Sequence, residues 1–209
     1  MQILEFINLI NTFSSKISTK NLILPSEDHT NKNSKSQLLS QKNALTLPAE
    51  LITYIDNICP EKTVNFTGVG HPISVLSYDA LSEESPGYNV DVSTGKPLKN
   101  WQNSWFLIAT DGGDPIIIDL NDRYEVSPVY SAMQGEENWD FVPIADSIGQ
   151  FLLCAAAIEH ALNFPAIIAP LDEDFNLAPA PAHWLFPLLK TYAGDHYDEW
   201  AGVFENYLA

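Results

Sequence analysis

The residues in this chain best able to do chemistry are carboxylates, and two short runs concentrate them. The first run, made of Glu136, Glu137 and Asp140, surrounds Trp139. The second run, made of Asp172, Glu173 and Asp174, is continuous. A carboxylate-dependent hydrolase needs two such groups at a defined separation in a cleft, and no spacing here singles out a pair. Each run is therefore interpreted as a solvated acidic loop. The alternative is a negatively charged protein-binding surface with Trp139 as its aromatic anchor. Trp139 could instead be a buried residue of the hydrophobic core, and this interpretation is favoured.

Motifs for other chemistries are missing from the sequence. It contains no G-x-S-x-G, no phosphate loop, no H-E-x-x-H and no paired C-x-x-C. The five histidines are isolated, and His160 lies in a helical pattern while His183 adjoins Trp184. Packing or hydrogen bonding explains such histidines better than metal ligation. We expect no catalytic residue and no cofactor.

A partial calcium-loop pattern runs from Asp119 to Glu125. It lacks the glycine at the sixth position and the glutamate at the twelfth that a calcium loop requires. Ordinary turn chemistry explains Asn121 and Asp122. The sequence therefore predicts no metal site.

Charge is distributed unevenly along the chain, whose net charge is −17. Residues 1–47 carry five lysines and three acids, whereas residues 48–209 carry five basic residues against 24 acids, a balance of −19. Such a surface repels nucleic acid and anionic membranes, because phosphate binding needs clustered lysine and arginine. It attracts and steers a cationic partner. Acidity that serves only to keep the protein in solution is the open alternative.

The cysteines and the hydropathy pattern bear on the compartment. Cys59 and Cys154 lie in apolar helical patterns, which predicts buried, reduced thiols. No basic segment precedes the first apolar residues, and no run of about 18 apolar residues occurs. We expect a cytoplasmic protein that does not span a membrane.

The first 45 residues divide into a helix and a polar arm. Five apolar residues recur at helical spacing over residues 3–13: Ile3, Phe6, Ile7, Ile10 and Phe13. This helix docks on the core or contacts a partner, and docking is favoured. Residues 14–43 are rich in serine, asparagine, lysine and glutamine, which predicts a linker or a long irregular arm.

Order is predicted again from Thr46, with a helix that ends at Pro60. Glu50 complements the positive N-terminal end of this helix. Its apolar face consists of Leu51, Ile52, Ile55, Ile58 and Cys59. Residues 73–81 fit a strand or a short helix, and residues 82–103 fit a loop.

A β-hairpin is the clearest local prediction. Apolar runs at 105–109 and 115–120 flank Asp111-Gly112-Gly113-Asp114, whose glycines tolerate the positive φ of a tight turn. Both strands are continuously apolar, so both faces of the sheet should be covered. A third strand is expected over 126–130, where Pro128 suggests an edge position or a bulge.

A helix capped by Asp146 or Ser147 follows, and runs to about residue 162. The tail from Asn163 holds several prolines and two short helical patterns, the second with Tyr197, Trp200, Phe204 and Tyr207 on one face. The order helix, strands, helix indicates an α+β fold.

In this order the elements resemble the SUKH superfamily, in the branch that includes the yeast cell-wall synthesis regulator. The likeness rests on the Leu47-Pro48 helix start, the Gly112-Gly113 hairpin, the Val129-Tyr130 strand and Ala145-Asp146-Ser147 before the second helix. It covers residues 46–162. It implies a mixed, largely antiparallel sheet flanked by helices, and a family without catalytic activity. The expected organisation is an N-terminal helix and polar arm (1–45), a SUKH-like domain (46–162) and a helical extension packed on that domain (163–209).

Bacterial members of the superfamily are mostly immunity proteins that neutralise toxins, and eukaryotic members are regulatory scaffolds. Resemblance and acidity together predict an immunity protein that binds a basic toxin domain, such as a nuclease. The expected contact residues are Glu136, Glu137, Trp139, Asp140, Asp172, Glu173 and Asp174. A regulatory scaffold linked to cell-envelope synthesis is the first alternative, and a carboxylate-dependent hydrolase is the lesser one.

Overall fold

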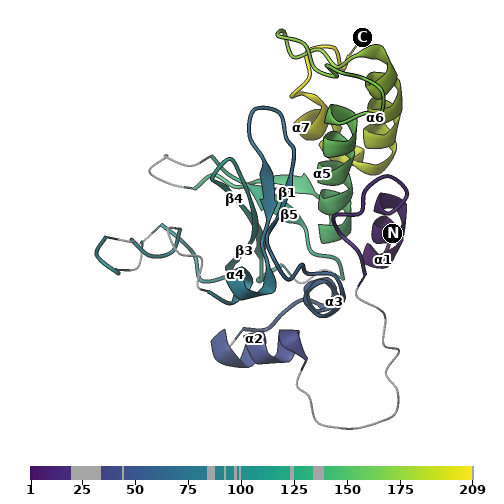
Figure 1. Ribbon diagram of the computed structural model, residues 1–209. Coiled ribbons are helices and arrows are strands. Elements are labelled where there is room, and N and C mark those ends of the chain that lie inside the picture. The colour runs from purple at the N-terminus through teal and green to yellow at the C-terminus, as the bar shows by residue number, and fades with distance from the viewer. Residues whose placement is uncertain are drawn as a thin grey trace, which may run out of the picture.

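The fold is α+β, with one antiparallel sheet and helices mainly on one side of it (Figure 1). The computed structural model describes residues 1–19, 34–43, 45–83, 88–91, 93–96, 98, 100–122, 125–133 and 139–208. The helices are α1 (Ile3–Ile10), α2 (Lys35–Asn43), α3 (Ala49–Asn57), α4 (Tyr78–Ser82), α5 (Ile148–Leu162), α6 (Pro179–Tyr192) and α7 (Tyr197–Ala201). The strands are β1 (Val64–Phe66), β2 (Ile73–Val75), β3 (Trp105–Asp111), β4 (Asp114–Asp119), β5 (Val129–Ser131) and β6 (Val142–Ala145).

The six strands form a meander in the order β1-β2-β3-β4-β5-β6, so each strand pairs with its neighbours in sequence. Every pairing is antiparallel, which confirms the α+β class and the largely antiparallel sheet. We call the face toward α5 the inner face and the opposite one the outer face.

The predicted hairpin is β3 and β4. Gly112 and Gly113 have φ of +58° and +110°, the left-handed values that a two-residue turn demands. Ile108 and Ile118 are buried in the main core on the inner face, whereas Leu107 and Ile117 are buried in a second cluster on the outer face. The prediction that both faces are covered is therefore confirmed.

The third strand is shorter than predicted and does not lie at the edge. β5 begins at Val129, after Pro128, and pairs with β4 on one side and β6 on the other. The edge alternative was wrong because residues 142–145 add a further strand. The bulge alternative holds, since the β5–β6 register shifts between Val129 and Tyr130.

The core of the inner face is built around α5. Ser147, one of the two caps that the sequence offered, caps this helix by accepting a hydrogen bond from the backbone N–H of Gln150 at 3.1 Å. Almost every residue from Ile148 to Ala161 is buried, including Cys154, whose thiol pKa is raised by burial. A helix that is buried almost all round must be covered by other elements on every side.

The N-terminal helix docks on the core. The apolar face of α1, with Ile3, Phe6, Ile7 and Ile10, is buried against α5. The contact depends on Gly149, because a Cβ at that position would lie 2.5 Å from Phe6 Cδ2.

The prediction of an irregular arm was wrong at residues 35–43, which form α2. Composition misled here, because α2 has few apolar residues and is held by tertiary contacts. Ser36 donates hydrogen bonds from its N–H and its hydroxyl to the Asp56 carboxylate at 2.9 and 2.7 Å, and Leu39 is buried. In the neighbouring α3, Ile52 was placed on the apolar face but is 39% exposed.

The C-terminal helices pack on the far side of α5 and at the β6 edge of the sheet (Figure 1). Gln150 Nε2 donates to the carbonyl of Tyr192 at 2.6 Å. Trp200 Nε1 donates to the carbonyl of Ile144 at 2.7 Å, so the extension binds an outward-facing backbone group of the edge strand. Covering an edge in this way prevents pairing with other chains.

Candidate protein-binding surface

The described end of the first predicted acidic run, at Trp139 and Asp140, lies beside the outer face. Glu136 and Glu137 fall outside the described residues, and Asp140 is exposed. Trp139 is half-buried and packs edge-on against Trp101, with ring centroids 5.8 Å apart. Its main contacts are therefore internal, which leaves Asp140 as the described residue of this run that faces solvent.

Trp139 belongs to an aromatic layer that the sequence reasoning missed. Six aromatic residues pack with Leu107 and Ile117 on the outer face: Tyr88, Trp101, Trp105, Tyr130, Trp139 and Phe141. The tightest pair is Trp105 and Phe141, at 4.6 Å between centroids. The alternation of Trp139 and Phe141 just before β6 is the signal that marks this layer, because alternate residues share one face of a strand.

The second predicted run forms the tip of a small exposed hairpin between α5 and α6. Leu171 and Leu177 pair across its base. Asp172 Oδ1 accepts hydrogen bonds from the N–H groups of Asn176 and Asp174, at 2.7 and 3.0 Å. The Asn176 bond is the main reason that the pKa of Asp172 is lowered. Asp172 thus shapes the loop.

Glu173 and Asp174 present the free charge of this loop. Both are exposed, and their side chains make no hydrogen bond or ion pair with any residue that the structure describes. Next to them stands Phe175, 48% exposed and at φ +60°. A bulky residue adopts this backbone conformation rarely, since its Cβ crowds the backbone. The carbonyl of Phe175 accepts the N–H of Glu205 at 3.1 Å, which fixes the loop on the C-terminal segment.

The structure does not bring the described residues of the two predicted runs together. Asp140 follows the outer aromatic layer, whereas residues 172–174 belong to the helical side of the sheet (Figure 1). They are therefore two separate acidic surfaces, and sequence spacing gave no sign of which side of the sheet each would occupy.

Another acidic residue, Glu50, is withdrawn from the surface. Its carboxylate accepts the N–H groups of Ser127 at 2.7 Å, Gly149 at 3.3 Å and Ile148 at 3.4 Å. Besides standing in the first turn of its own helix, as predicted, it therefore stabilises the N-terminus of α5. Burial raises the pKa of Glu50, and the three N–H donors oppose that rise.

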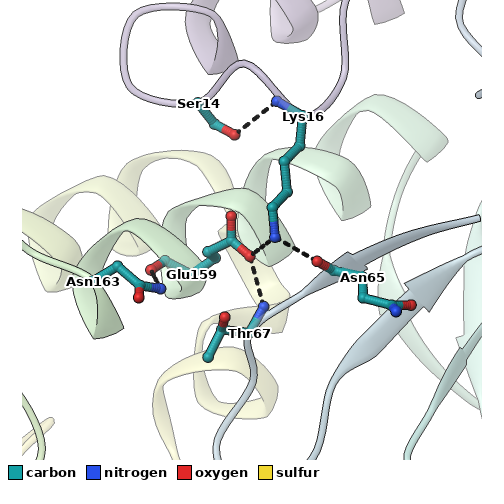
Figure 2. Close-up of polar contacts among 6 residues, drawn as sticks. All are labelled: Ser14, Lys16, Asn65, Thr67, Glu159 and Asn163. Atoms are coloured by element: carbon teal, nitrogen blue, oxygen red, sulfur yellow. Dashed lines mark hydrogen bonds and ion pairs between the residues drawn. The ribbon is translucent and has the colours of Figure 1, made fainter.

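Few cations neutralise the remaining acids. Among the described residues, Lys16 with Glu159 is the one lysine–carboxylate ion pair (Figure 2). Lys16 Nζ also donates to the carbonyl of Asn65, and Glu159 Oε2 accepts the N–H of Thr67 at 2.7 Å (Figure 2). This network ties the N-terminal segment to α5 and to edge strand β1. It holds the fold together.

Two histidine–carboxylate contacts also occur among the residues that the structure describes. His71 Nδ1 lies 2.7 Å from Asp111 Oδ1, and His196 Nε2 lies 3.1 Å from Asp146 Oδ1. No group of three or more potential metal ligands occurs in the part of the chain that the structure describes. Among the same residues, no helix has the length and apolarity needed to cross a membrane.

Comparison with known proteins identifies one family. The model of the SMI1 / KNR4 family (SUKH-1) matches residues 35–154, from the start of α2 to the middle of α5. The match begins earlier than the resemblance seen in the sequence, because it includes α2. No curated protein and no solved structure matches the chain.

Proposed function

Because the chain belongs to the SMI1 / KNR4 family (SUKH-1), we propose that it is a non-enzymatic immunity protein that binds and neutralises a cationic toxin domain. A nuclease is the toxin class that fits best, because a protein that binds nucleic acid presents clustered lysine and arginine. An acidic protein of this charge would cover such a surface and exclude the substrate.

The observation that carries the proposal is the unneutralised acidity of the chain outside its N-terminal arm. Residues 48–209 have a balance of −19, and the lysine–carboxylate pair seen in the described residues uses Lys16 from the N-terminal segment. The negative electrostatic field of such a surface raises the rate of association with partners of opposite charge and selects them over others. A scaffold whose acids were paired internally would gain little in association rate or in selectivity for a cationic partner.

The proposed contact surface includes the 172–174 loop. Glu173 and Asp174 supply charge, and exposed Phe175 supplies the apolar anchor that hot spots usually contain. Glu136, Glu137 and Asp140 extend the proposal to the acidic surface beside Trp139. The proposal locates the protein in the cytoplasm, where Cys59 and Cys154 would stay reduced.

The test is binding to the toxin domain encoded beside this gene. The purified domain should bind the full chain in calorimetry, with an affinity that falls as salt rises, and the chain should abolish its activity. Co-expression should restore the growth of cells that produce the toxin. A neighbouring toxin that does not bind would refute the proposal. A gene without such a neighbour, placed among envelope-synthesis genes, would favour a regulatory scaffold instead.

A further inference from the structure

An open groove lies between the sheet and the C-terminal extension, at the end of the sheet where β3 turns into β4. Its volume is about 310 Å³. Ile73, Ile116 and Ile144, from three strands, line its floor, and Glu199, Trp200 and Val203 line one wall. The hydrogen bond from Trp200 Nε1 to the carbonyl of Ile144 joins that wall to the floor.

Apolar side chains at the groove remain in contact with water. Val142 is 50% exposed on the sheet side, and Val203 is 43% exposed on the opposite wall. Burying both under another molecule would remove apolar surface from water, which is favourable. The volume is at the lower limit of sites that enclose small molecules, roughly 300–1,000 Å³, which suits a single anchoring side chain better than a metabolite.

The charge at the groove is acidic. Asp111 and Glu199 line it together with His71, and none of the lysines that the structure describes does. Glu199 is exposed and makes no side-chain hydrogen bond or ion pair within the described parts of the chain. An occupant with a positive charge beside its apolar group would therefore complement the groove.

The groove combines the family fold with an addition to it. The family match ends at residue 154, whereas Glu199, Trp200 and Val203 lie in the extension. The groove is also connected to the acidic 172–175 hairpin. The N–H of Glu205 donates to the carbonyl of Phe175 in that hairpin, and Glu205 is only two residues beyond Val203 of the groove. Hairpin and groove are thus supported by the same C-terminal segment.

We propose that this groove receives an apolar side chain of the protein partner, while a neighbouring arginine or lysine of that partner pairs with Glu199 and Asp111. The inference rests on the proposed function, because it names the part of the surface that determines specificity. Arginine suits the position best, since its planar group can pair with a carboxylate through two hydrogen bonds. The extension would then adapt the family fold to one partner.

A direct test titrates the ¹⁵N-labelled full chain with a capped pentapeptide of alternating arginine and leucine. We expect shifts in the amide signals of Val142 and Val203 and in the indole signal of Trp200. Replacing arginine with glutamate, or leucine with serine, should abolish them. Glu199→Lys should weaken peptide binding by about tenfold, through a lost attraction and a new repulsion. Shifts confined to other surfaces would overturn the inference.

Matched variants control for charge and for apolar surface. Glu61→Lys makes the same charge change at an exposed site before the start of β1, whereas the groove lies beyond the other end of that strand. It should alter peptide binding by less than about twofold. Val203→Ser should weaken binding, whereas Ile168→Ser, at a fully exposed side chain that does not line the groove, should not. Equal effects within either pair would count against the groove.

The toxin domain separates this inference from the proposed function. If the toxin binds and Glu199→Lys weakens it more than Glu61→Lys, both proposals stand. If the toxin binds all variants equally, the groove is not its site, although the immunity function survives. If no toxin binds but the peptide does, the immunity function fails while the groove keeps its preference for cationic, apolar segments.

Discussion

Carboxylates serve opposite purposes in two regions of this molecule. At the α3–α5 junction, Glu50 is buried and bonded to three backbone N–H groups. In the 172–175 hairpin, Glu173 and Asp174 are exposed, and their side chains make no hydrogen bond or ion pair with the described residues. A buried charge is tolerated only when hydrogen bonds compensate for the lost water, whereas an exposed one keeps its water until a partner replaces it. The first acid therefore stabilises the fold, and the others remain available for binding.

Replacing Glu50 with alanine is the strongest way to break the junction. The change leaves the N–H groups of Ser127, Ile148 and Gly149 without their acceptor in a buried place. We expect a loss of about 3 kcal/mol in the free energy of unfolding. Urea denaturation would measure it, with Asp79→Ala, at an exposed acid, as the control. A loss similar to that of the control would mean that Glu50 does not hold the junction.

Gly149→Ala tests the same junction by adding one methyl group. The new Cβ would lie 2.5 Å from Phe6 Cδ2 and 3.1 Å from Ile3 Cα, so α1 must shift. We expect a net destabilisation of about 1–2 kcal/mol, because overpacking outweighs the gain in helix propensity. Thermal unfolding of Gly149→Ala, Phe6→Leu and the double variant should show partial rescue in the double variant. A more stable Gly149→Ala protein would contradict close docking of α1.

The features that the sequence could predict depend on residues close together in the chain, and those it could not predict depend on distant ones. The β3–β4 hairpin and the N-cap of α5 are local signals, with partners a few residues apart. The hairpin was predicted correctly, and the cap was narrowed to Asp146 or Ser147, of which Ser147 is the one observed. The contact between Glu50 and Ile148 joins residues 98 positions apart, and no local pattern encodes it. Polar composition concealed α2, whose Ser36 finds its partner in α3. The exposed position of Phe175 depends on a hydrogen bond to the C-terminal segment, which the sequence does not reveal.

The pH dependence of stability separates the charge of Glu50 from its hydrogen bonds. Burial raises its pKa in the folded state, so the folded chain binds the proton more tightly than the unfolded chain. This stabilisation is complete below the unfolded pKa of glutamate and is lost as pH rises through the higher folded pKa. The difference in unfolding free energy between wild type and Glu50→Gln should therefore grow in favour of wild type as pH falls from 7 toward about 4.5. Urea denaturation at several pH values measures it, and a constant difference would argue against a raised pKa.

The smallest effect on stability is expected in the exposed hairpin. A Glu173→Gln, Asp174→Asn double variant removes two charges without altering the loop, because Asp172 and its bonds to Asn176 and Asp174 N–H remain. We expect unchanged thermal unfolding, since exposed acids without partners contribute little to folding. The association rate with a cationic toxin domain should fall, most clearly at low salt, because long-range charge accelerates encounter. Stopped-flow kinetics would measure the rate, with the equally charge-reduced Glu61→Gln, Asp79→Asn variant as the control. A rate equal to that of the control would show that the hairpin contributes only to the total charge, and binding specificity would then have to come from another surface.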